Sequence, residues 1–371
     1  MMGLALSGGG FRATLFHVGS LLRLNEAGLL RDLDEVTSVS GGSIIAGHLA
    51  LNWSRLQFSD QGVAANFDEV VARPIREFCA RTIDVGTILG GILNPVRHPS
   101  EKLIANYRKH LYGDRTLQDL PGPGEGPAFT IYATSLQTGA SVRFTRLYLG
   151  EYHLGKIPNP TILVATAVAA SSAFPPPLCP VKLSVDPNAW EPSDISDLHD
   201  DAYLKETMWL GDGGIYDNLG VERLTQRCDR ILVSDAGAPF SVDRKMKATR
   251  FSQVARTKRT LDIMSAQVRA LRTRQLIRQF VKGEKRGAYW GIGTRIGEFP
   301  LAENNLSPAL VNDSDTTSAI SRMRTRLNAF NPKEQAHLIN WGYALADSAL
   351  RSRFDMAIAD PAGLPEADYL I

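Results

Sequence analysis

The chain opens with Met2-Gly3-Leu4-Ala5-Leu6-Ser7-Gly8-Gly9-Gly10-Phe11-Arg12, and one helical segment later it continues with Val36-Thr37-Ser38-Val39-Ser40-Gly41-Gly42. Each stretch is an apolar run that ends in a turn of serine and glycine. Strand, turn and helix in this alternation predict a βαβα unit, whose parallel strands bring both turns to the same edge of the sheet. These two turns are therefore the first candidates for a functional site.

The second turn has the features of a nucleophile elbow centred on Ser40. A serine on a sharp strand-to-helix turn needs small residues two positions before and after it, and Ser38 and Gly42 are small. The pattern departs from G-x-S-x-G because Ser38 stands where the leading glycine is usual. Gly41 follows directly, and a helix over residues 44–52 would direct its positive end at the serine. The alternative is that Ser40 is simply the N-cap of that helix.

The first turn predicts a set of backbone donors. Gly8, Gly9 and Gly10 lack a Cβ, so their amides can approach a ligand closely and form an oxyanion hole. A phosphate-binding loop and a plain tight turn are the alternatives, but no Gly-Lys-Ser/Thr follows the glycines. Arg12 lies beside the loop and could either hold the turn or steer an anionic head group.

A third candidate lies far downstream, in Trp209-Leu210-Gly211-Asp212-Gly213-Gly214-Ile215-Tyr216-Asp217-Asn218. Asp212 ends an apolar segment and has glycine on both sides, so a serine hydroxyl could reach its carboxylate directly. A structural Asp-Gly turn is the alternative. Asp217 and Asn218 are interpreted as local turn and capping residues.

Together, these motifs resemble those of the patatin-like phospholipase family. The segments 133–139 and 170–175 add to the resemblance, which spans residues 3–235. It implies a three-layer α/β/α fold with a mainly parallel sheet, extra C-terminal helices, and hydrolysis of fatty-acyl esters of phospholipids by a serine acyl-ester hydrolase. It further implies a Ser40–Asp212 dyad and an oxyanion hole at Gly8–Gly10, with no metal or cofactor. Arg12, Gly41, Gly42, Gly213 and Gly214 would support this site.

Several alternatives remain open at this stage. A Ser-His-Asp triad would require a histidine after the acid, and His337, in a helical pattern, is the only one there. His17 and His48 lie on predicted helices beside the two turns. The activity could instead be that of a lysophospholipase or a neutral-lipid esterase. The protein could also be a membrane-degrading effector activated by a ligand at residues 244–286, or a lipid-binding module with an incidental dyad.

Composition and chain organisation are consistent with one globular hydrolase domain over residues 1–371. A core at 1–240 carries an insertion at about 58–125, and 241–371 is expected to be mainly helical, with a disordered end after Ala359. No apolar run reaches the length of a membrane span and no signal segment is recognised, so a cytoplasmic protein, peripheral at the inner membrane face, is expected. The three cysteines have neither metal nor disulfide spacing. The oligomeric state is left open.

Two segments have less certain roles. Residues 244–286 are strongly basic and have apolar positions at helical spacing, which could suit an anionic lipid surface, a phosphate-bearing ligand or a protein partner, or merely a solvated helix face. A nucleic-acid partner is not expected. The apolar segment within 82–96 could be a lid or could pack in the core. Asp235, at the end of a predicted strand, could support the site or cap the next turn.

Overall fold

The computed structural model describes residues 1–83, 99–175, 178–244 and 253–371. Most of the 82–96 segment, whose role as lid or core was left open, lies outside the described residues. The helices α1 (Gly10–Glu26) and α2 (Gly41–Leu51) follow the two turns identified in the sequence, as a βαβα unit requires. None of the described helices is long and apolar enough to cross a bilayer.

Ten strands form one mixed sheet, in the order β10-β9-β1-β2-β3-β4-β5-β6, with β8 also paired to β3 and β7 paired to β8. The parallel strands are β1 (Met2–Leu6), β2 (Glu35–Val39), β3 (Ala128–Ser135), β9 (Arg230–Asp235) and β10 (Arg286–Gly291). The antiparallel strands are β4 (Ser141–Phe144), β5 (Tyr148–Glu151), β6 (Gly155–Pro158), β7 (Val181–Ser184) and β8 (Thr207–Asp212). β10 was not expected in the region predicted to be mainly helical.

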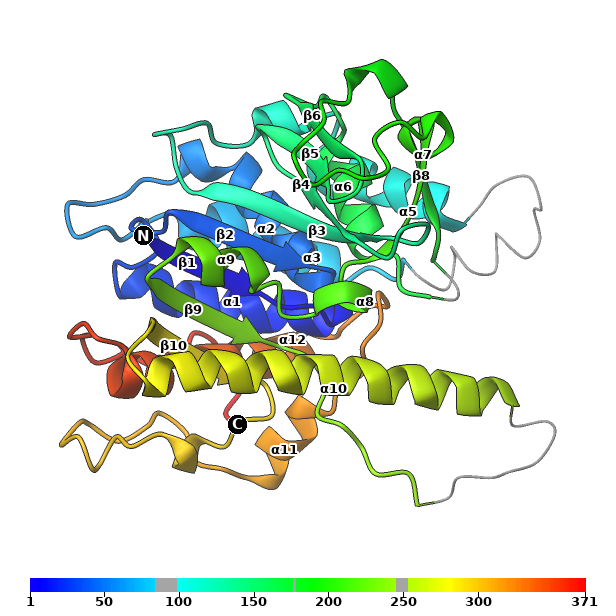
Figure 1. Cartoon of the computed structure of the whole chain (residues 1–371). Coiled ribbons are helices and arrows are strands. Elements are labelled where there is room, and N and C mark those ends of the chain that lie inside the picture. The colour runs from blue at the N-terminus through cyan, green and yellow to red at the C-terminus, as the bar shows by residue number, and fades with distance from the viewer. Residues whose placement is uncertain (84–98, 176–177, 245–252) are drawn as a thin grey trace.

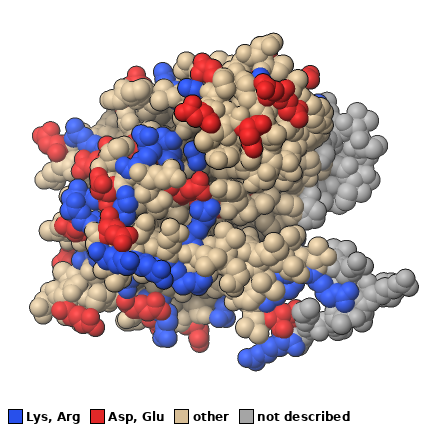
Figure 2. Space-filling model, viewed as in Figure 1, with Lys and Arg blue, Asp and Glu red and all other residues tan. Residues whose placement is uncertain are grey.

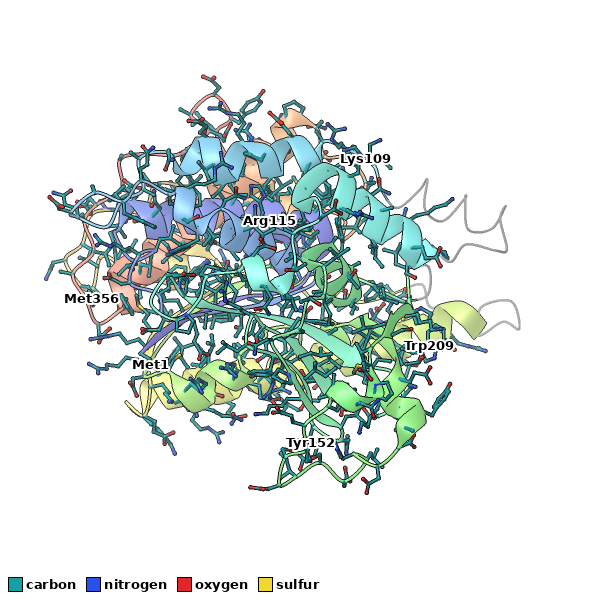
Figure 3. The ribbon with its side chains drawn as sticks, turned by 90° about the horizontal axis from the view of Figure 1, so that it is seen from above. Met1, Lys109, Arg115, Tyr152, Trp209 and Met356 are labelled. Carbon is teal, nitrogen blue, oxygen red and sulfur yellow. The ribbon has the colours of Figure 1, made fainter. Side chains whose placement is uncertain are left out.

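Helices cover both faces of this sheet (Figure 1). They are α1 (Gly10–Glu26), α2 (Gly41–Leu51), α3 (Arg73–Cys79), α5 (Pro99–Tyr107), α6 (Val164–Ser171), α7 (Ala202–Glu206), α8 (Gly214–Asp217), α9 (Glu222–Arg227), α10 (Gln253–Val281), α11 (Asp315–Ser321) and α12 (Pro332–Arg353). Figure 3 gives the view from above, with Lys109 and Tyr152 on opposite sides of the molecule.

The alternation of side chains along the central strands divides the core into two layers. Leu4 and Leu6 of β1 face the large cluster that contains α1, α2, α6 and α12. Ala5, between them, faces the smaller cluster with Leu224 of α9 and Leu276 of α10. The chain therefore has the three-layer α/β/α architecture expected from the sequence.

Close helix packing fixes α1 under the sheet. A Cβ on Gly19 of α1 would lie 1.9 Å from the Ile339 carbonyl oxygen of α12, and one on Gly342 would lie 2.0 Å from the Phe16 carbonyl oxygen. Only glycine allows the two backbones to approach this closely. α1 is thereby held along its length, and so is the glycine turn at its start.

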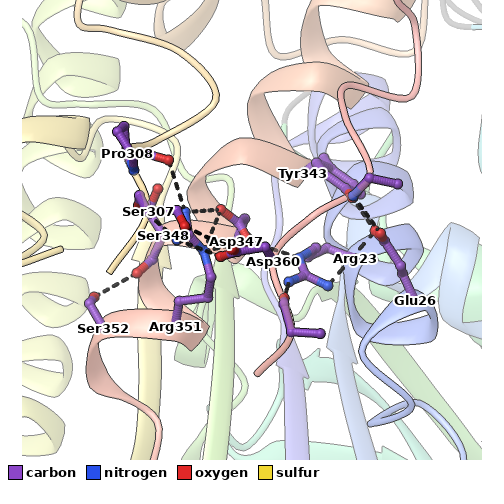
Figure 4. Close-up of polar contacts among 12 residues, drawn as sticks. Arg23, Glu26, Ser307, Pro308, Tyr343, Asp347, Ser348, Arg351, Ser352 and Asp360 are labelled. Atoms are coloured by element: carbon purple, nitrogen blue, oxygen red, sulfur yellow. Dashed lines mark hydrogen bonds and ion pairs between the residues drawn. The ribbon is translucent and has the colours of Figure 1, made fainter. Parts of the chain in front are cut away.

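A buried ionic cluster joins the same two helices to the end of the chain (Figure 4). Asp347 of α12 accepts hydrogen bonds from Arg23 of α1 at 2.9 Å and from Arg351 at 2.8 Å, and all three side chains are inaccessible to solvent. Asn340 donates to the carbonyls of Glu366 and Tyr369 at 2.9 and 2.8 Å. The expectation of a disordered end after Ala359 is therefore wrong, because buried polar groups of α1 and α12 hold this segment.

Candidate functional site

Ser40 lies on the turn between β2 and α2 with backbone angles of φ 51° and ψ −118°. A non-glycine residue with positive φ is strained, and such strain is typical of functional sites. Its side chain makes no capping hydrogen bond to the helix, so the N-cap alternative does not describe Ser40. A Cβ on Gly41 would lie 2.1 Å from the Gly10 carbonyl oxygen, and one on Gly42 2.3 Å from that of Leu6. The turn therefore requires both glycines.

Asp212 ends β8 and meets Ser40 across the sheet edge. Its carboxylate accepts a hydrogen bond from the Gly214 amide at 2.7 Å. Burial raises the pKa of Asp212 to about 6, although the Gly214 amide and the nearby Ser40 side chain oppose the rise. A Cβ on Gly213 would lie 2.5 Å from the Tyr132 carbonyl oxygen, so the turn after Asp212 packs directly on β3.

The glycine turn lies against the nucleophile elbow. A Cβ on Gly8 would lie 3.1 Å from the Ser40 Cβ. The Gly8 amide donates to the Asn218 carbonyl at 3.1 Å and is therefore not free to bind a ligand. The amides of Gly9 and Gly10 have no acceptor among the described residues. Gly9 and Gly10 adopt φ of 149° and 60°. The turn can thus offer the Gly9 and Gly10 amides to an anion, next to the positive end of α1.

A chain of hydroxyl groups lies beneath the elbow and was not identified in the sequence. The Ser40 amide donates to the Ser171 hydroxyl at 2.9 Å, and Ser171 lies 2.9 Å from the Ser43 hydroxyl. Ser43 donates to Ser38 at 3.0 Å, and Ser38 to the Thr130 carbonyl at 3.4 Å. Because each later hydroxyl has its acceptor fixed, Ser171 donates to Ser43 and accepts from Ser40.

This chain explains why Ser38 replaces the usual glycine. The Ser38 hydroxyl ends the chain by donating to the backbone of β3, and so links the elbow to the sheet. The sequence did contain a signal, since Ser171 stands in the apolar run Val168-Ala169-Ala170-Ser171-Ser172-Ala173. A serine buried in such a run needs a hydrogen-bond partner, but sequence alone could not identify the Ser40 amide as that partner.

Arg12 holds the turn instead of facing an incoming head group. Its guanidinium donates to the carbonyls of Met323 and Ala236, both at 2.8 Å, and its side chain is almost fully buried. Burial lowers the pKa of Arg12 to about 10. Asp235, at the end of β9, accepts from the Gly237 amide at 2.9 Å and from Arg269 at 2.8 Å. Asp235 therefore caps its turn and anchors α10.

The histidines considered for a triad have other partners. His17 contacts the Ser7 carbonyl at 2.9 Å and the Ser234 hydroxyl at 2.8 Å, and burial lowers its pKa to about 4. His48 contacts the Val70 carbonyl at 3.0 Å, and His337 lies on α12. Within the described part of the chain, no histidine hydrogen-bonds to Ser40 or Asp212. The ionisable side chain that affects Ser40 most directly in this arrangement is therefore the carboxylate of Asp212.

Comparison with protein families agrees with the motifs. A family model described as patatin-like phospholipase matches residues 4–225. Human GIVD cytosolic phospholipase A2 superposes with a TM-score of 0.48 and 14% identity, covering 94% of this chain and 61% of that one. VipD from Legionella pneumophila superposes with a TM-score of 0.39 and 16% identity, covering 95% of this chain and 66% of that one. The chain thus spans less than two thirds of either protein. No curated protein sequence matches it.

Proposed function

Because the chain belongs to the patatin-like phospholipase family, we propose that it hydrolyses fatty-acyl esters of phospholipids, with Ser40 as nucleophile and Asp212 as general base. The observation that carries this proposal is the buried Asp212 carboxylate beside Ser40, whose side chain lies close enough to oppose the rise that burial causes in the pKa of Asp212. A nucleophile within hydrogen-bond reach of its base is the geometry that covalent catalysis needs. The strained φ of Ser40 supports the assignment independently.

In the first step, the Ser40 oxygen attacks the ester carbonyl and its proton passes to Asp212. An ordinary aspartate, with a pKa near ~3.9, is a weak base. Burial raises the Asp212 pKa to about 6, which makes it a stronger base that is still ionised at neutral pH. Because the Ser40 amide is held by Ser171, the nucleophile keeps its position as the proton leaves.

The tetrahedral intermediate carries its negative charge on the former carbonyl oxygen. The amides of Gly9 and Gly10 would donate to this oxygen, while Gly8, whose amide is engaged with Asn218, shapes the turn. Donors of this kind contribute roughly 3 kcal/mol each where they have been measured. α1 and α2 begin at Gly10 and Gly41, so the positive ends of both helices lie at the site.

Collapse of the intermediate breaks the ester bond. The proton held by Asp212 passes to the leaving alcohol, and the acyl group stays on Ser40 as an ester. Asp212, ionised again, then takes a proton from water, whose hydroxyl attacks the acyl-enzyme. Release of the fatty acid returns the proton to Ser40.

Fatty-acid release from mixed phospholipid vesicles, with chelator present, tests the proposal. The unmodified protein should release fatty acid, Ser40→Ala and Asp212→Asn should release none while remaining folded, and exposed Ser193→Ala should match the unmodified protein. An alkyl fluorophosphonate should label Ser40 and spare the Ser40→Ala variant. Full activity of Ser40→Ala would refute the assignment of the nucleophile.

The substrate panel also decides between related activities. Lysophospholipids and soluble short-chain esters are offered alongside the vesicles. Release from soluble esters but not from vesicles would favour a neutral-lipid or general esterase, and preference for the single-chain lipid would favour a lysophospholipase. Absence of both release and labelling would reject the hydrolase proposal altogether.

A further inference from the structure

The long helix α10 exposes a stripe of large apolar side chains. Leu261, Met264, Val268 and Leu271 are 57%, 60%, 39% and 59% exposed. Their spacing of three, four and three residues places them along one face of the helix. We call these four residues the α10 stripe. A contiguous apolar surface that faces solvent is a mark of an interaction site.

The rest of the helix shows why the stripe faces outward. Along the docked part of the helix, Arg269 forms an ion pair with buried Asp235 at 2.7 Å, Arg272 lies 3.5 Å from Asp217, and Leu276 is buried. These contacts fix the rotation of α10 about its axis. Figure 1 shows α10 crossing the front of the sheet, with its N-terminal part projecting beyond α8.

The docked part of α10 is close to the proposed catalytic site. A Cβ on Gly9 would lie 3.0 Å from the Ala236 carbonyl oxygen, and one on the adjacent Gly237 would lie 2.7 Å from the Arg269 guanidinium carbon. One short loop therefore separates the glycine turn from α10. The helix projects on the side where β1 and β2 end, which is where Gly9 and Ser40 lie.

Exposed apolar residues also surround the turn that carries Asp212. Phe174, Ile215 and Leu136 are 55%, 43% and 45% exposed. Ile215 and Leu136 both approach Gly211, the residue before Asp212, since a Cβ there would lie 2.9 and 3.1 Å from them. Apolar surface is thus found on α10 and at the site itself.

Charge decides which partner suits the stripe. Between residues 253 and 281 the sequence has seven cations, and Asp262 is its only acid. Arg274 and Arg278 are exposed beyond the stripe, and Figure 2 shows cationic side chains gathered along α10. A second copy of the helix would bring charges of the same sign together, whereas an anionic lipid surface would attract them.

From these observations we infer that the α10 stripe inserts into the surface of an anionic phospholipid bilayer and brings Ser40 to its substrate. The inference rests on the proposed lipid hydrolase function. Leu261, Met264, Val268 and Leu271 would enter the headgroup region, and Arg274 and Arg278 would contact the lipid phosphates. Burial of apolar side chains at the headgroup boundary and attraction of cations to anionic lipids are the two contributions by which helices bind a membrane surface without spanning it.

Vesicle sedimentation tests the docking surface in the Ser40→Ala background, where no lipid is consumed. Met264→Gln together with Leu271→Gln should lower partition into vesicles rich in phosphatidylserine by roughly tenfold or more. Arg274→Gln and Arg278→Gln should each lower it by roughly fivefold on anionic vesicles, and much less on uncharged ones. Met356→Gln is the matched control, because Met356 is 40% exposed and lies on the C-terminal segment.

The paired activity assay separates this inference from the proposed function. With Ser40 present, Met264→Gln/Leu271→Gln should lose hydrolysis of vesicles yet keep hydrolysis of a soluble short-chain ester. Unchanged vesicle binding by this variant would overturn the inference, whatever the enzyme does. So would a dimer in sedimentation equilibrium that the variant converts to monomers, with vesicle binding intact. If the unmodified protein did not hydrolyse the soluble ester, the proposed hydrolase function would be rejected instead.

Discussion

Asp212→Asn should stabilise the protein at neutral pH while it removes the proposed activity. The Asp212 carboxyl is buried, and its pKa in the folded protein is raised from 3.8 to about 6. The folded state therefore binds this proton more tightly than the unfolded chain does. Ionisation of Asp212 opposes folding: the loss of stability begins near pH 4, grows up to about pH 6, and is constant above that.

The size of the effect follows from the pKa shift. About two pKa units at 1.36 kcal/mol each give roughly 3 kcal/mol of lost stability at neutral pH. Asparagine carries no charge, and its carbonyl oxygen can still accept from Ser40 and Gly214. Its amide group needs a new partner, which removes part of the gain at every pH. The cost of the amide group does not change with pH. The change in the free energy of unfolding caused by Asp212→Asn should therefore be about 2 to 3 kcal/mol larger at pH 7.5 than at pH 4.

Urea unfolding of both proteins at pH 4 and 7.5 measures this difference. The free energy of unfolding of Asp212→Asn, relative to the unmodified protein, should rise by that amount between the two pH values. The same exchange at Asp200, whose carboxylate is exposed, should show little such rise. A difference for Asp212→Asn that does not change with pH would refute the argument that burial of an ionised carboxylate prepares the base.

Three further outcomes follow from the same contacts. The kcat/KM for a soluble ester should rise with pH through an apparent pKa of about 6, because only ionised Asp212 accepts the Ser40 proton; a flat profile from pH 5 to 8 would contradict this. Ser171→Ala leaves the Ser40 amide without its acceptor, so kcat should fall and urea unfolding should show a loss of about 1–3 kcal/mol. Arg23→Met removes one partner of buried Asp347 and should lower the free energy of unfolding by about 3 kcal/mol or more in the same experiment, with the proposed dyad untouched; an unchanged midpoint of unfolding would contradict this energy for the buried cluster.

The elbow, the glycine turn and the Asp212 turn could be predicted because backbone geometry restricts the residues that fit there. A Cβ on Gly41 or Gly42 would clash with a neighbouring carbonyl oxygen, and one on Gly213 would clash with the carbonyl oxygen of Tyr132, so each position excludes a side chain. Restrictions of this kind are visible in sequence as glycines at fixed offsets from a strand. The order of strands, turns and helices then implies that the turns meet at one sheet edge.

Other features depend on contacts between distant segments, which a single sequence does not reveal. β10 has the residues of an ordinary short strand, and its place beside β9 is fixed only by the fold. Ser171 could be noticed as a serine in an apolar run, but its bond to the Ser40 amide joins residues far apart in the chain. The end after Ala359 lacks strong periodicity, yet Asn340 holds it through two backbone carbonyls.

For α10, the sequence predicts the helix but not which of its apolar residues are buried. Periodicity in the sequence groups Met264, Leu271 and Leu276 as one apolar helix pattern, although Leu276 is buried and the other two are exposed. What divides them is the pair of anchors, Arg269 on Asp235 and Arg272 on Asp217, which set the rotation of the helix. Those two arginines also account for part of the basic character that suggested a ligand-binding region. Their charge neutralises carboxylates near the Ser40 and Asp212 turns, and the cations left exposed, Arg274 and Arg278, follow the apolar stripe, which is the composition that a lipid surface favours.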